Sequence, residues 1–371
     1  MSLDRINGGG SVERTLQLTR HLLKAGVECR LVATDTGLVP DSIRDLEESV
    51  TALPTMMERF YVPRFSHRVL KELVAAVDVV HLMNHWTVLN ALAFHYCRHL
   101  GKPYVVCPAG ALPTVHGRSR GIKGFYNFFV GRRIIREANA AVAISPLEIP
   151  DFRSYGVRDD LITVIPNGID PEDFTDRDDD RFRREHGLPG EPFILFVGRL
   201  HFIKGPDLLL EAYMQAVRRE GLPHHLVLAG PDGGMLRELQ RSCESAGFGK
   251  RVHFTGYIGG GEKSRAYHAA AFLAIPSRRE AMSIVVLEAG ITGTPALITR
   301  QCGFDEIAAA GGGIVVEATV EGLREGLISM VKAPGGLAAM GRSLEGFARE
   351  NFLWDYITKR YLELFEGILS R

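Results

Sequence analysis

Residues 193–213 read FILFVGRLHFIKGPDLLLEAY, and this stretch decides the fold class. Its first five residues are continuously apolar, which is typical of a strand buried on both faces of a parallel sheet. The turn at 198–205 contains glycines, and a helical segment follows from residue 206. Strand, turn and helix in this order form the repeating unit of a doubly wound α/β domain.

The same alternation extends along the whole chain. Short apolar runs are separated by longer segments of helical period, and they lie at 29–34, 78–83, 103–108, 140–145, 161–166, 225–230, 251–256, 271–277, 295–299 and 313–317. Such strands predict parallel sheets that helices cover on both faces. We therefore expect an α/β protein with two doubly wound, Rossmann-like halves.

The length of 371 residues favours two domains over a single core. Residues 165–192 interrupt both periods with Asn167-Gly168, prolines and dense charge. We expect an N-terminal domain at 1–170, a linker at 171–190, a C-terminal domain at 191–350 and a terminal helix at 351–371 that packs back on the N-terminal domain. Ligands of such sheets bind beyond the carboxyl ends of the strands, so a cleft between two facing domains is the default site.

The N-terminus does not fit this scheme fully. A doubly wound domain should begin with a strand that leads into the glycine turn, yet only seven polar-leaning residues precede Gly8-Gly9-Gly10. Either the native product starts about one strand, roughly 5 to 6 residues, further upstream, or the first strand is absent. The initial MSL is also compatible with a vector remnant.

Composition restricts the partners and the compartment. Lys and Arg total 44 and Asp and Glu total 44, so no net charge attracts nucleic acid. The five cysteines are scattered without a Cys-x-x-Cys pair, which argues against a disulfide framework or a structural zinc site and favours a reducing cytoplasm. No uncharged apolar run approaches the roughly 18 residues that cross a bilayer. We expect a cytoplasmic protein that is at most peripheral to the inner face of the membrane.

Two strand-to-helix turns carry residues suited to a phosphorylated ligand. In the first, Gly198, Arg199 and Lys204 lie beside a helix N-terminus, an arrangement that binds anions. The alternative is a pair of solvated cations.

The second turn lies in SRREAMSIVVLEAG at 277–290. Glu280 lies in the turn and Glu288 on the following helix, so both carboxylates can face one cleft and accept hydrogen bonds from sugar hydroxyls. The amides at the helix start, on Ser283, Ile284 and Val285, suit a phosphate. The alternative is a carboxylate that stabilises the helix dipole and an ordinary surface glutamate.

The motifs GRLHFIKG, LAGPDGG, VHFTGYI, PSRREAMSIVVLEAG and GTPALIT occur in this order. The set resembles the nucleotide-sugar glycosyltransferases of the large retaining GT-B family, of the group 1 or family 4 type. The resemblance extends over most of the chain, because GGGSVERTLQLTRHLLKAG, IPNGID and FLWDYITKRYLELF also match, and it is most specific at 194–300. It implies two facing Rossmann-like domains with a cleft between them.

The resemblance also implies roles for matching residues. Arg199 and Lys204 bind the donor diphosphate, Glu280 contacts the transferred sugar and Glu288 holds the ribose. The base meets backbone groups of Tyr257 and Ile258. The residues implied in donor binding are Gly9, Gly10, Gly198, Arg199, Lys204, Tyr257, Ile258, Glu280, Ser283, Ile284, Val285 and Glu288, and those implied in catalysis are Glu280, Arg199 and Lys204. The resemblance implies retention of configuration and neither a metal nor another cofactor.

Two departures from the family pattern affect the transferred sugar. Ala109 stands where the family frequently has the histidine of a Pro-His-Gly pattern, and His116 is either its substitute or a surface histidine. The usual Glu-Gly-Phe-Gly reads Glu280-Ala281-Met282-Ser283, which predicts a differently shaped sugar pocket.

Two patterns are typical of metal sites, but we expect neither to bind a metal. The Asp-x-Asp arrangements at 176–180 resemble those of metal-dependent glycosyltransferases but lie among arginines in the linker, which favours a solvated charge run. The pairs His81/His85 and His95/His99 have i,i+4 spacing. His81 is expected to end a strand, and neither pair has Glu in the second position; His85 and Trp86 are expected to line the cleft.

Residues 116–137 combine Arg and Lys with Phe125, Tyr126, Phe128 and Phe129. Such a stretch suits an anionic membrane surface or a phosphate-bearing acceptor. The alternative is that the aromatic side chains pack inward on the sheet while the cations face water. We place His85, His116 and Arg118 on the acceptor side.

The sequence thus predicts a hexosyltransferase-like enzyme that moves a sugar from a nucleoside-diphosphate sugar to a glycan or lipid-linked acceptor in surface polysaccharide synthesis. Three alternatives stay open: a catalytically silent relative that binds nucleotide sugar, a nucleotide-sugar epimerase of the same fold, and a phosphorylase, which would need a lysine for pyridoxal phosphate.

Overall fold

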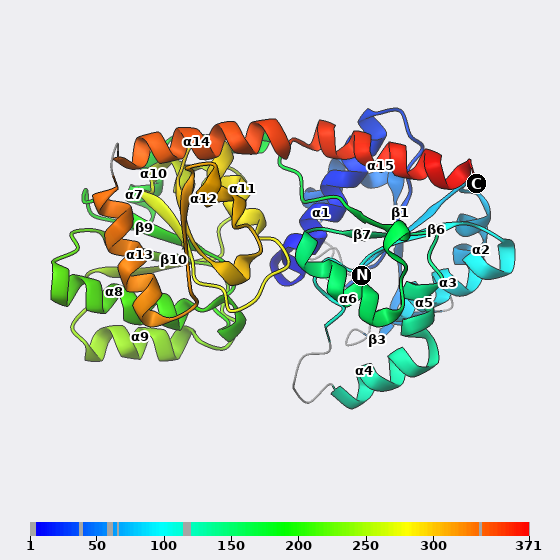
Figure 1. Ribbon diagram of the computed structural model, residues 1–371, viewed down its shortest axis with the longest axis horizontal. Coiled ribbons are helices and arrows are strands. Elements are labelled where there is room, and N and C mark those ends of the chain that lie inside the picture. The colour runs from blue at the N-terminus through cyan, green and yellow to red at the C-terminus, as the bar shows by residue number, and fades with distance from the viewer. Residues whose placement is uncertain are drawn as a thin grey trace. The chain divides into compact units, whose positions relative to one another are not determined.

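The computed structural model describes residues 5–36, 40–57, 62–64, 67–113, 120–333 and 336–370. The chain divides into two compact units, of which unit 1 comprises Met1–Gly168 with Trp354–Arg371 and unit 2 comprises Ile169–Leu353 (Figure 1). The segment 171–190, treated above as a linker, lies in unit 2, where α7 (Asp179–Glu185) packs against α10 (Gly260–Ala269). The segment from Trp354 onward lies in unit 1.

Unit 1 contains a four-stranded parallel sheet in the order β5-β6-β7-β8. Its strands are β5 (Val80–Met83), β6 (Tyr104–Cys107), β7 (Ala140–Ala143) and β8 (Ile162–Val164). Every residue of β6 and β7 is buried, as expected for central strands that are covered on both faces. His81 is the second residue of β5 and does not end the strand, contrary to the expectation above.

The remaining elements of unit 1 are two short strand pairs and a set of helices. Two further pairs of strands occur, one parallel and one antiparallel: β1 (Leu31–Thr34) with β2 (Val50–Leu53), and β3 (Thr55–Met57) with β4 (Val62–Pro63). The helices are α1 (Arg5–Lys24), η1 (Pro40–Ser49), α2 (His67–Ala75), α3 (Val88–Leu100), α4 (Arg120–Tyr126), the π-helix η3 (Asn127–Gly131), α5 (Arg132–Arg136), η4 (Pro146–Glu148), α6 (Ile149–Tyr155), η5 (Asp159–Leu161) and α15 (Trp354–Leu369).

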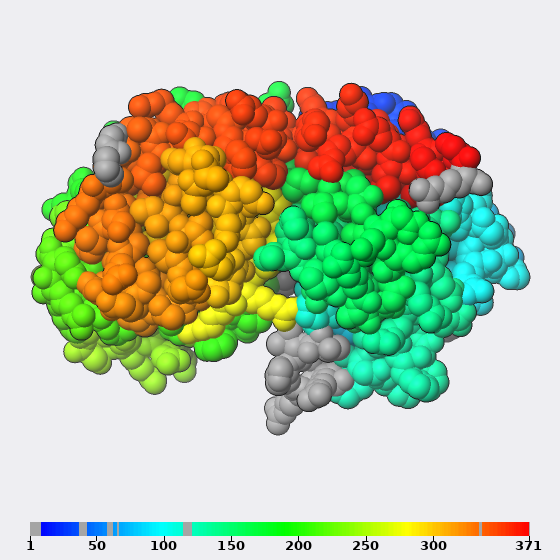
Figure 2. All heavy atoms as spheres, viewed as in Figure 1, coloured from blue at the N-terminus to red at the C-terminus, as the bar shows by residue number. Residues whose placement is uncertain are grey.

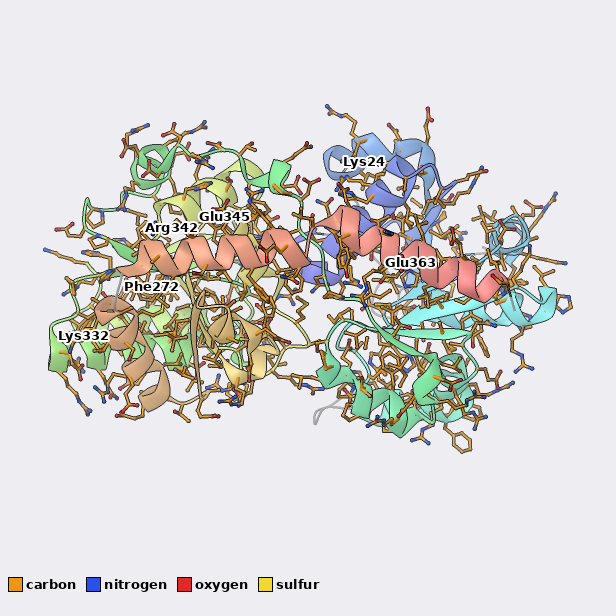
Figure 3. The ribbon with its side chains drawn as sticks, turned by 45° about the horizontal axis from the view of Figure 1, so that its top comes forward. Lys24, Phe272, Lys332, Arg342, Glu345 and Glu363 are labelled. Atoms are coloured by element: carbon orange, nitrogen blue, oxygen red, sulfur yellow. The ribbon has the colours of Figure 1, made fainter. Side chains whose placement is uncertain are left out.

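Helix α15 is joined to unit 1 by the guanidinium group of Arg14. This side chain is fully buried and donates to Oη of Tyr361 at 2.6 Å and to Oδ1 of Asn167 at 2.7 Å. At the start of α15 the indole of Trp354 packs so closely on Gly168 that a Cβ there would lie 2.4 Å from the ring. Figure 3 shows α15, with Glu363 labelled on it, and α1, which ends at Lys24.

Unit 2 contains a six-stranded parallel sheet in the order β11-β10-β9-β12-β13-β14. Its strands are β9 (Phe193–Val197), β10 (His225–Ala229), β11 (Val252–Gly256), β12 (Phe272–Ile275), β13 (Ala296–Thr299) and β14 (Gly313–Val316). Its helices are η6 (Pro171–Phe174), α7, η7 (Phe202–Lys204), α8 (Pro206–Glu220), α9 (Leu236–Ser245), α10, α11 (Ile284–Ile291), η8 (Arg300–Cys302), α12 (Glu306–Ala309), α13 (Val320–Lys332) and α14 (Gly336–Asn351). The predicted parallel sheets of both halves are confirmed.

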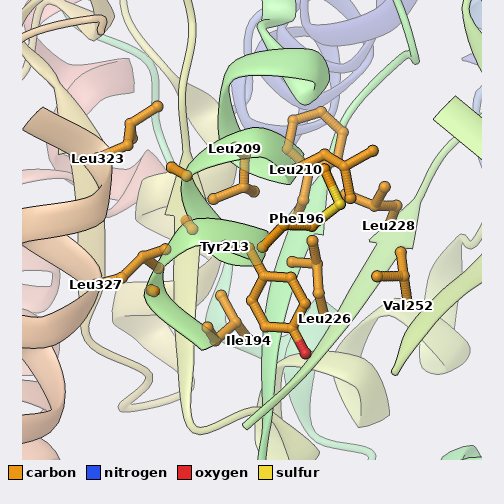
Figure 4. Close-up of a cluster of buried hydrophobic side chains, with 14 of the residues drawn as sticks. Ile194, Phe196, Leu209, Leu210, Tyr213, Leu226, Leu228, Val252, Leu323 and Leu327 are labelled. Atoms are coloured by element: carbon orange, nitrogen blue, oxygen red, sulfur yellow. The ribbon is translucent and has the colours of Figure 1, made fainter. Parts of the chain in front are cut away.

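The core of unit 2 forms where α8 and α13 cover one face of the sheet. Ile194 and Phe196 of β9 meet Leu209 and Tyr213 of α8, and all four side chains are buried (Figure 4). Near-continuous apolar strands pack in this way because both faces of a parallel sheet are removed from water.

The strand order of unit 2 reverses between β9 and β12. From β9 the chain runs outward through β10 and β11, then returns to place β12 on the other side of β9. The loops that leave these two neighbouring strands diverge, and such a switch point is where ligands of doubly wound sheets bind.

Candidate active site

The turn after β9 carries the first group of predicted site residues. Arg199 is exposed and Lys204 ends the short helix η7. Gly205 follows with φ +70°, and a Cβ there would lie 2.1 Å from the carbonyl oxygen of Pro276 in the turn after β12. Only glycine combines this conformation with so close a contact, so the sequence Lys204-Gly205 places the ammonium group next to the neighbouring turn.

The turn after β12 is joined to the turn after β9 by several contacts. The backbone N–H of Arg278 donates to the carbonyl oxygen of Ile203 at 2.8 Å. The Arg278 guanidinium group forms a two-pronged ion pair with Asp207 at the start of α8, with distances of 2.8 and 2.6 Å. The two turns therefore behave as one structural element at the switch point.

Within this element, Nζ of Lys204 lies 2.8 Å from Oε1 of Glu280. The hydroxyl of Ser277 donates to the same carboxylate oxygen, and the backbone N–H of Glu280 donates to the carbonyl oxygen of Gln301 at 2.8 Å. The Glu280 side chain is 9% exposed and that of Lys204 is 37% exposed. Sequence positions 76 residues apart thus meet in one ion pair.

Burial opposes ionisation of Glu280, but the Lys204 ammonium group and the Ser277 hydroxyl group outweigh it. The pKa of Glu280 consequently lies below its ordinary value. The carboxylate is therefore ionised near neutral pH and can accept hydrogen bonds from an incoming ligand.

Glu288 lies in a separate cluster. Its side chain is 4% exposed, and its carboxylate accepts from Nζ of Lys263 at 2.6 Å and from Oη of Tyr267 at 2.6 Å, both on α10. Burial, and then the neighbouring carboxylate, raise the pKa of Tyr267 well above its ordinary value, so its hydroxyl stays protonated as a donor. The two glutamates of the motif are thus held by different partners.

The remaining residues implied in donor binding also follow strands of unit 2. Ser283 is the N-cap of α11, so the amides of Ile284 and Val285 belong to its first turn, where N–H groups lack partners within the helix. Tyr257 is 45% exposed and Ile258 is buried, directly after β11.

The predicted residues of unit 1 have a different setting. Gly9 and Gly10, which were expected in a turn that follows a strand, lie inside α1, and Gly9 interrupts the helix with φ 56° and ψ −144°. His85 was expected to line a cleft, but its side chain is 1% exposed and its Nε2 lies 2.9 Å from Oδ1 of Asn127. Burial lowers the pKa of His85 to about 4. His116 and Arg118 lie outside the described residues.

The rival metal patterns have structural partners. Asp176 accepts from Arg265 at 2.6 Å, and the side chain of Asp178 caps α7. His81 is half-buried beside Tyr361 of α15, and His95 stacks on His99 along α3. In the described part of the chain no group of three or more His, Cys, Asp or Glu side chains is placed to hold a metal ion.

Sequence reasoning missed Ser277, Lys263, Tyr267 and Asp207. Ser277 lies within the quoted motif, three residues before Glu280, and this spacing was the one available signal. Lys263 and Tyr267 have i,i+4 spacing on α10 and so share one face, but nothing local connects that face to Glu288.

Among the described helices none is long and apolar enough to span a membrane.

Comparison with known families assigns both halves of the chain. The model for glycosyl transferases group 1 matches residues 178–344, and the model for Glycosyltransferase Family 4 matches residues 8–173. One curated relative, the D-inositol 3-phosphate glycosyltransferase of Actinosynnema mirum, is 31% identical over 62% of this chain. That alignment covers 58% of the relative, so the chain spans little more than half the length of the relative it matches.

Solved structures share the fold at low sequence identity. Anabaena Alr3699/HepE in complex with UDP and glucose superposes with a TM-score of 0.79 at 17% identity, covering 97% of this chain and 96% of that one. The sucrose-phosphate synthase of Thermosynechococcus elongatus gives 0.76 at 20% identity, covering 98% and 94%. The predicted GT-B class with two Rossmann-like domains is confirmed. With each half matched by its own family model, the chain belongs to the group 1 glycosyltransferase family.

Proposed function

We propose that the chain transfers a sugar from a nucleoside-diphosphate sugar to a glycan or lipid-linked acceptor, with retention of configuration and without a metal. The observation that carries this proposal is the Lys204–Glu280 pair, which joins a cation and a carboxylate at the switch point of the unit 2 sheet. A donor needs both groups side by side, because its diphosphate is anionic and its sugar presents hydroxyl donors.

The chemistry of the leaving group supports the role of this site. As the glycosidic bond breaks, negative charge accumulates on the departing diphosphate. Arg199, Lys204 and the N-terminal amides of α11 are fixed positive groups that would stabilise that charge, and no divalent ion is then required. Retention is taken from the family resemblance; no side chain is assigned as a nucleophile.

The two glutamates then have distinct tasks. Glu280 would orient the transferred sugar through hydroxyl hydrogen bonds while Lys204 moves to the diphosphate. Glu288 would hold the ribose, which requires the nucleotide to share or replace the Lys263 contact. Backbone groups of Tyr257 and Ile258 would meet the base.

The direct test is a binding screen with UDP, GDP, ADP and their sugar conjugates, by thermal shift and calorimetry. A specific ligand at a hundredfold excess over its dissociation constant stabilises the folded protein by about 2.7 kcal/mol. We expect one nucleotide to bind wild type and to lose at least tenfold in affinity with R199A/K204A. The matched control is R219A/K250A, which removes two exposed cations of unit 2 near the amino ends of the strands.

Turnover separates an enzyme from a silent relative. We expect wild type to hydrolyse the bound donor to free nucleotide and sugar, with water as the acceptor, even with a chelator present, and E280Q to bind the donor but to hydrolyse it at least tenfold more slowly. Nuclear magnetic resonance of the first-formed sugar, recorded before mutarotation, or of the glycoside formed with an added acceptor should show the donor's anomeric configuration. If the protein binds the donor but does not turn it over in the presence of any acceptor tested, the silent relative is favoured. If a free epimeric sugar is formed, the epimerase is favoured.

We also place the reaction in the cytoplasm, at the inner membrane face, as part of surface polysaccharide synthesis. The five cysteines are all free thiols, which is consistent with a reducing compartment. Incorporation of labelled sugar into a lipid extract, and its absence from a water-soluble acceptor fraction, would support a lipid-linked acceptor.

A further inference from the structure

Residues 120–136 form one continuous helical run on unit 1, made of α4, the π-helix η3 and α5. Its inner face is anchored to the protein. Oη of Tyr126 donates to the carbonyl oxygen of His85 at 2.9 Å, and Nδ2 of Asn127 donates to Oη of Tyr155 at 2.7 Å. Further along, Ile134 and Ile135 are 2% and 1% exposed.

The outer face of the same run, which we call the outer stripe, is apolar at its start and cationic at its end. Its apolar members are Ile122, Phe125, Phe128 and Phe129, which are 48%, 67%, 80% and 57% exposed, and its cationic members are the exposed Arg132, Arg133 and Arg136. Figure 2 shows this segment, in blue-green, at the surface of unit 1. The alternative, in which the aromatic side chains pack inward, is therefore wrong for Phe125, Phe128 and Phe129.

The inner face cannot accept the phenylalanines, because it is already filled. The ring of Tyr126 lies among His85 and Trp86, with ring centroids 5.5 and 5.7 Å away. Gly131 completes the π-turn so tightly that a Cβ there would lie 2.4 Å from Oδ1 of Asn127. These contacts fix the rotation of the helical run and so hold Phe125, Phe128 and Phe129 outward.

The exposed rings form a cluster. The ring centroids of Phe125 and Phe129 are 4.3 Å apart, and those of Phe128 and Phe129 are 5.1 Å apart. A surface helix normally turns polar residues toward water. Contiguous exposed apolar side chains on a protein surface mark a contact with a partner or a membrane.

Charge indicates which of these contacts the outer stripe makes. Between Asp78 and Glu137 the sequence has eight Lys and Arg residues and neither Asp nor Glu, although the whole chain is balanced at 44 of each sign. Glu137 itself is held by ion pairs with Arg98 and Arg133. A positive, aromatic surface complements anionic lipid headgroups, whose potential attracts clustered Lys and Arg.

We propose that the outer stripe docks on an anionic lipid bilayer, with the phenyl rings of Phe125, Phe128 and Phe129 in the interfacial region and the arginines at the headgroup phosphates. This proposal names the residues that contact the membrane and the charge of the lipid that they bind. Its biological purpose, access to a lipid-linked acceptor, rests on the proposed function. A second protein is the weaker alternative, because four apolar side chains are few for an interface of about 800 Å² per partner.

Vesicle sedimentation with the full chain tests this docking without any sugar donor, so its result is independent of donor binding and turnover. We expect binding to vesicles of phosphatidylcholine with phosphatidylglycerol, weaker binding at high salt, and little binding to phosphatidylcholine alone. The variant F125S/F128S/F129S should bind at least tenfold more weakly. R132Q/R133Q/R136Q should lose the preference for anionic lipid.

The control variant M56S/V69S/L147S removes three other exposed apolar side chains of unit 1, which are 64%, 42% and 58% exposed. It should bind vesicles like wild type, which excludes a general effect of lost hydrophobic surface. Circular dichroism and a thermal unfolding curve for each variant check that the fold is retained, which matters most for the arginine variant, because Arg133 pairs with Glu137 and Arg132 donates to the carbonyl oxygen of Ser154.

A local probe gives a second readout. In F128W the new indole should shift its emission to the blue with anionic vesicles and be quenched by brominated lipid, whereas L147W should do neither. Equal vesicle binding by the phenylalanine and control variants would overturn the proposal. A second result would also overturn it: wild type fails to bind vesicles but self-associates, and F125S/F128S/F129S abolishes the self-association. The outer stripe would then be a contact between copies of this chain.

Discussion

Nζ of Lys263 lies 2.6 Å from Oε1 of Glu288, and this contact joins α10 to α11 across unit 2. The carboxylate is 4% exposed and the lysine 22% exposed, so the pair is largely removed from water. Tyr267 donates to the other carboxylate oxygen. A buried carboxylate is costly unless its charge is compensated, so the ammonium group of Lys263 offsets the burial of Glu288.

Removal of Lys263 should therefore destabilise unit 2. We expect K263M to lower the free energy of unfolding by about 2 kcal/mol, less than for a fully buried pair because the lysine is partly exposed. In the E288Q background, K263M should cost much less than it does in wild type. The double-mutant cycle, measured by urea titrations followed by circular dichroism, should therefore give a coupling energy of about 1 to 2 kcal/mol. K250M, at an exposed turn, should stay within about 0.5 kcal/mol of wild type. Additive effects of K263M and E288Q would contradict the coupling.

The contact between the two site turns should be sensitive to one methyl group. Gly205 and Gly221 both end helical segments, with φ of +70° and +68°, but only Gly205 has a neighbour, the Pro276 carbonyl oxygen. G221A should cost about 1 kcal/mol from its left-handed backbone alone. G205A should cost at least about 2 kcal/mol more and weaken nucleotide binding, because the turn must move to relieve the clash. Urea titration measures the loss of stability and calorimetry the loss of nucleotide affinity. Equal losses in G205A and G221A would be inconsistent with the close contact.

His85 should make unit 1 less stable in mild acid. Above pH 6.5 its imidazole is neutral in the folded and the unfolded chain. As the pH falls from 6.5 toward about 4, the unfolded chain takes up a proton that the buried side chain excludes. The free energy of unfolding should then decrease by up to about 3 kcal/mol and change no further through this group below that range.

Tryptophan fluorescence reports this loss, because both tryptophans, Trp86 and Trp354, lie in unit 1. H85Q can still donate to Asn127 but does not titrate, so its stability should fall less steeply between pH 7 and 4. Burial also lowers the pKa of His81, to about 3, so His81 continues to contribute to the pH dependence of stability in H85Q. H99Q, changed at an exposed position, serves as the control and should keep the wild-type slope. An unchanged slope in H85Q would mean that another group causes the acid sensitivity.

The attachment of α15 to unit 1 should depend on the hydroxyl of Tyr361. This hydroxyl accepts from the fully buried Arg14 at 2.6 Å, and its removal leaves a buried cation with one partner fewer. Y361F should therefore lower the free energy of unfolding of unit 1 by about 1.5 to 3 kcal/mol. Y356F, at an exposed tyrosine on the same helix, should have little effect. Tryptophan fluorescence during urea unfolding measures both, and equal stability of the two variants would show that Arg14 finds another acceptor.

Much of the architecture could be read from local sequence. The run at 193–197 forms β9, and the turn and helix that follow it form η7 and α8. Glu280 and Lys204 were also identified as site candidates from their places after strands. These features depend on which residue types follow one another, because a strand buried on both faces must be apolar throughout and a turn that leaves it must contain residues with the required backbone freedom.

Other features depend on contacts between distant segments. Neither the 76-residue separation of Lys204 and Glu280 nor the 25-residue separation of Lys263 and Glu288 has a local signature. The pattern of residues 116–137 leaves open whether Phe125, Phe128 and Phe129 pack inward or face a membrane. His85 was expected at a cleft but is buried, and Gly9 was expected in a turn but lies within α1.

The sequence by itself determined the strands, the turns and the residue types at the turns, since these follow from periodicity over a few residues. Tertiary structure decided which charges pair and which aromatic rings stay exposed. The physical reason is that strand order brings separate turns together, while a side chain's burial depends on whether other residues already fill the space, as Tyr126 and Asn127 do beneath the outer stripe.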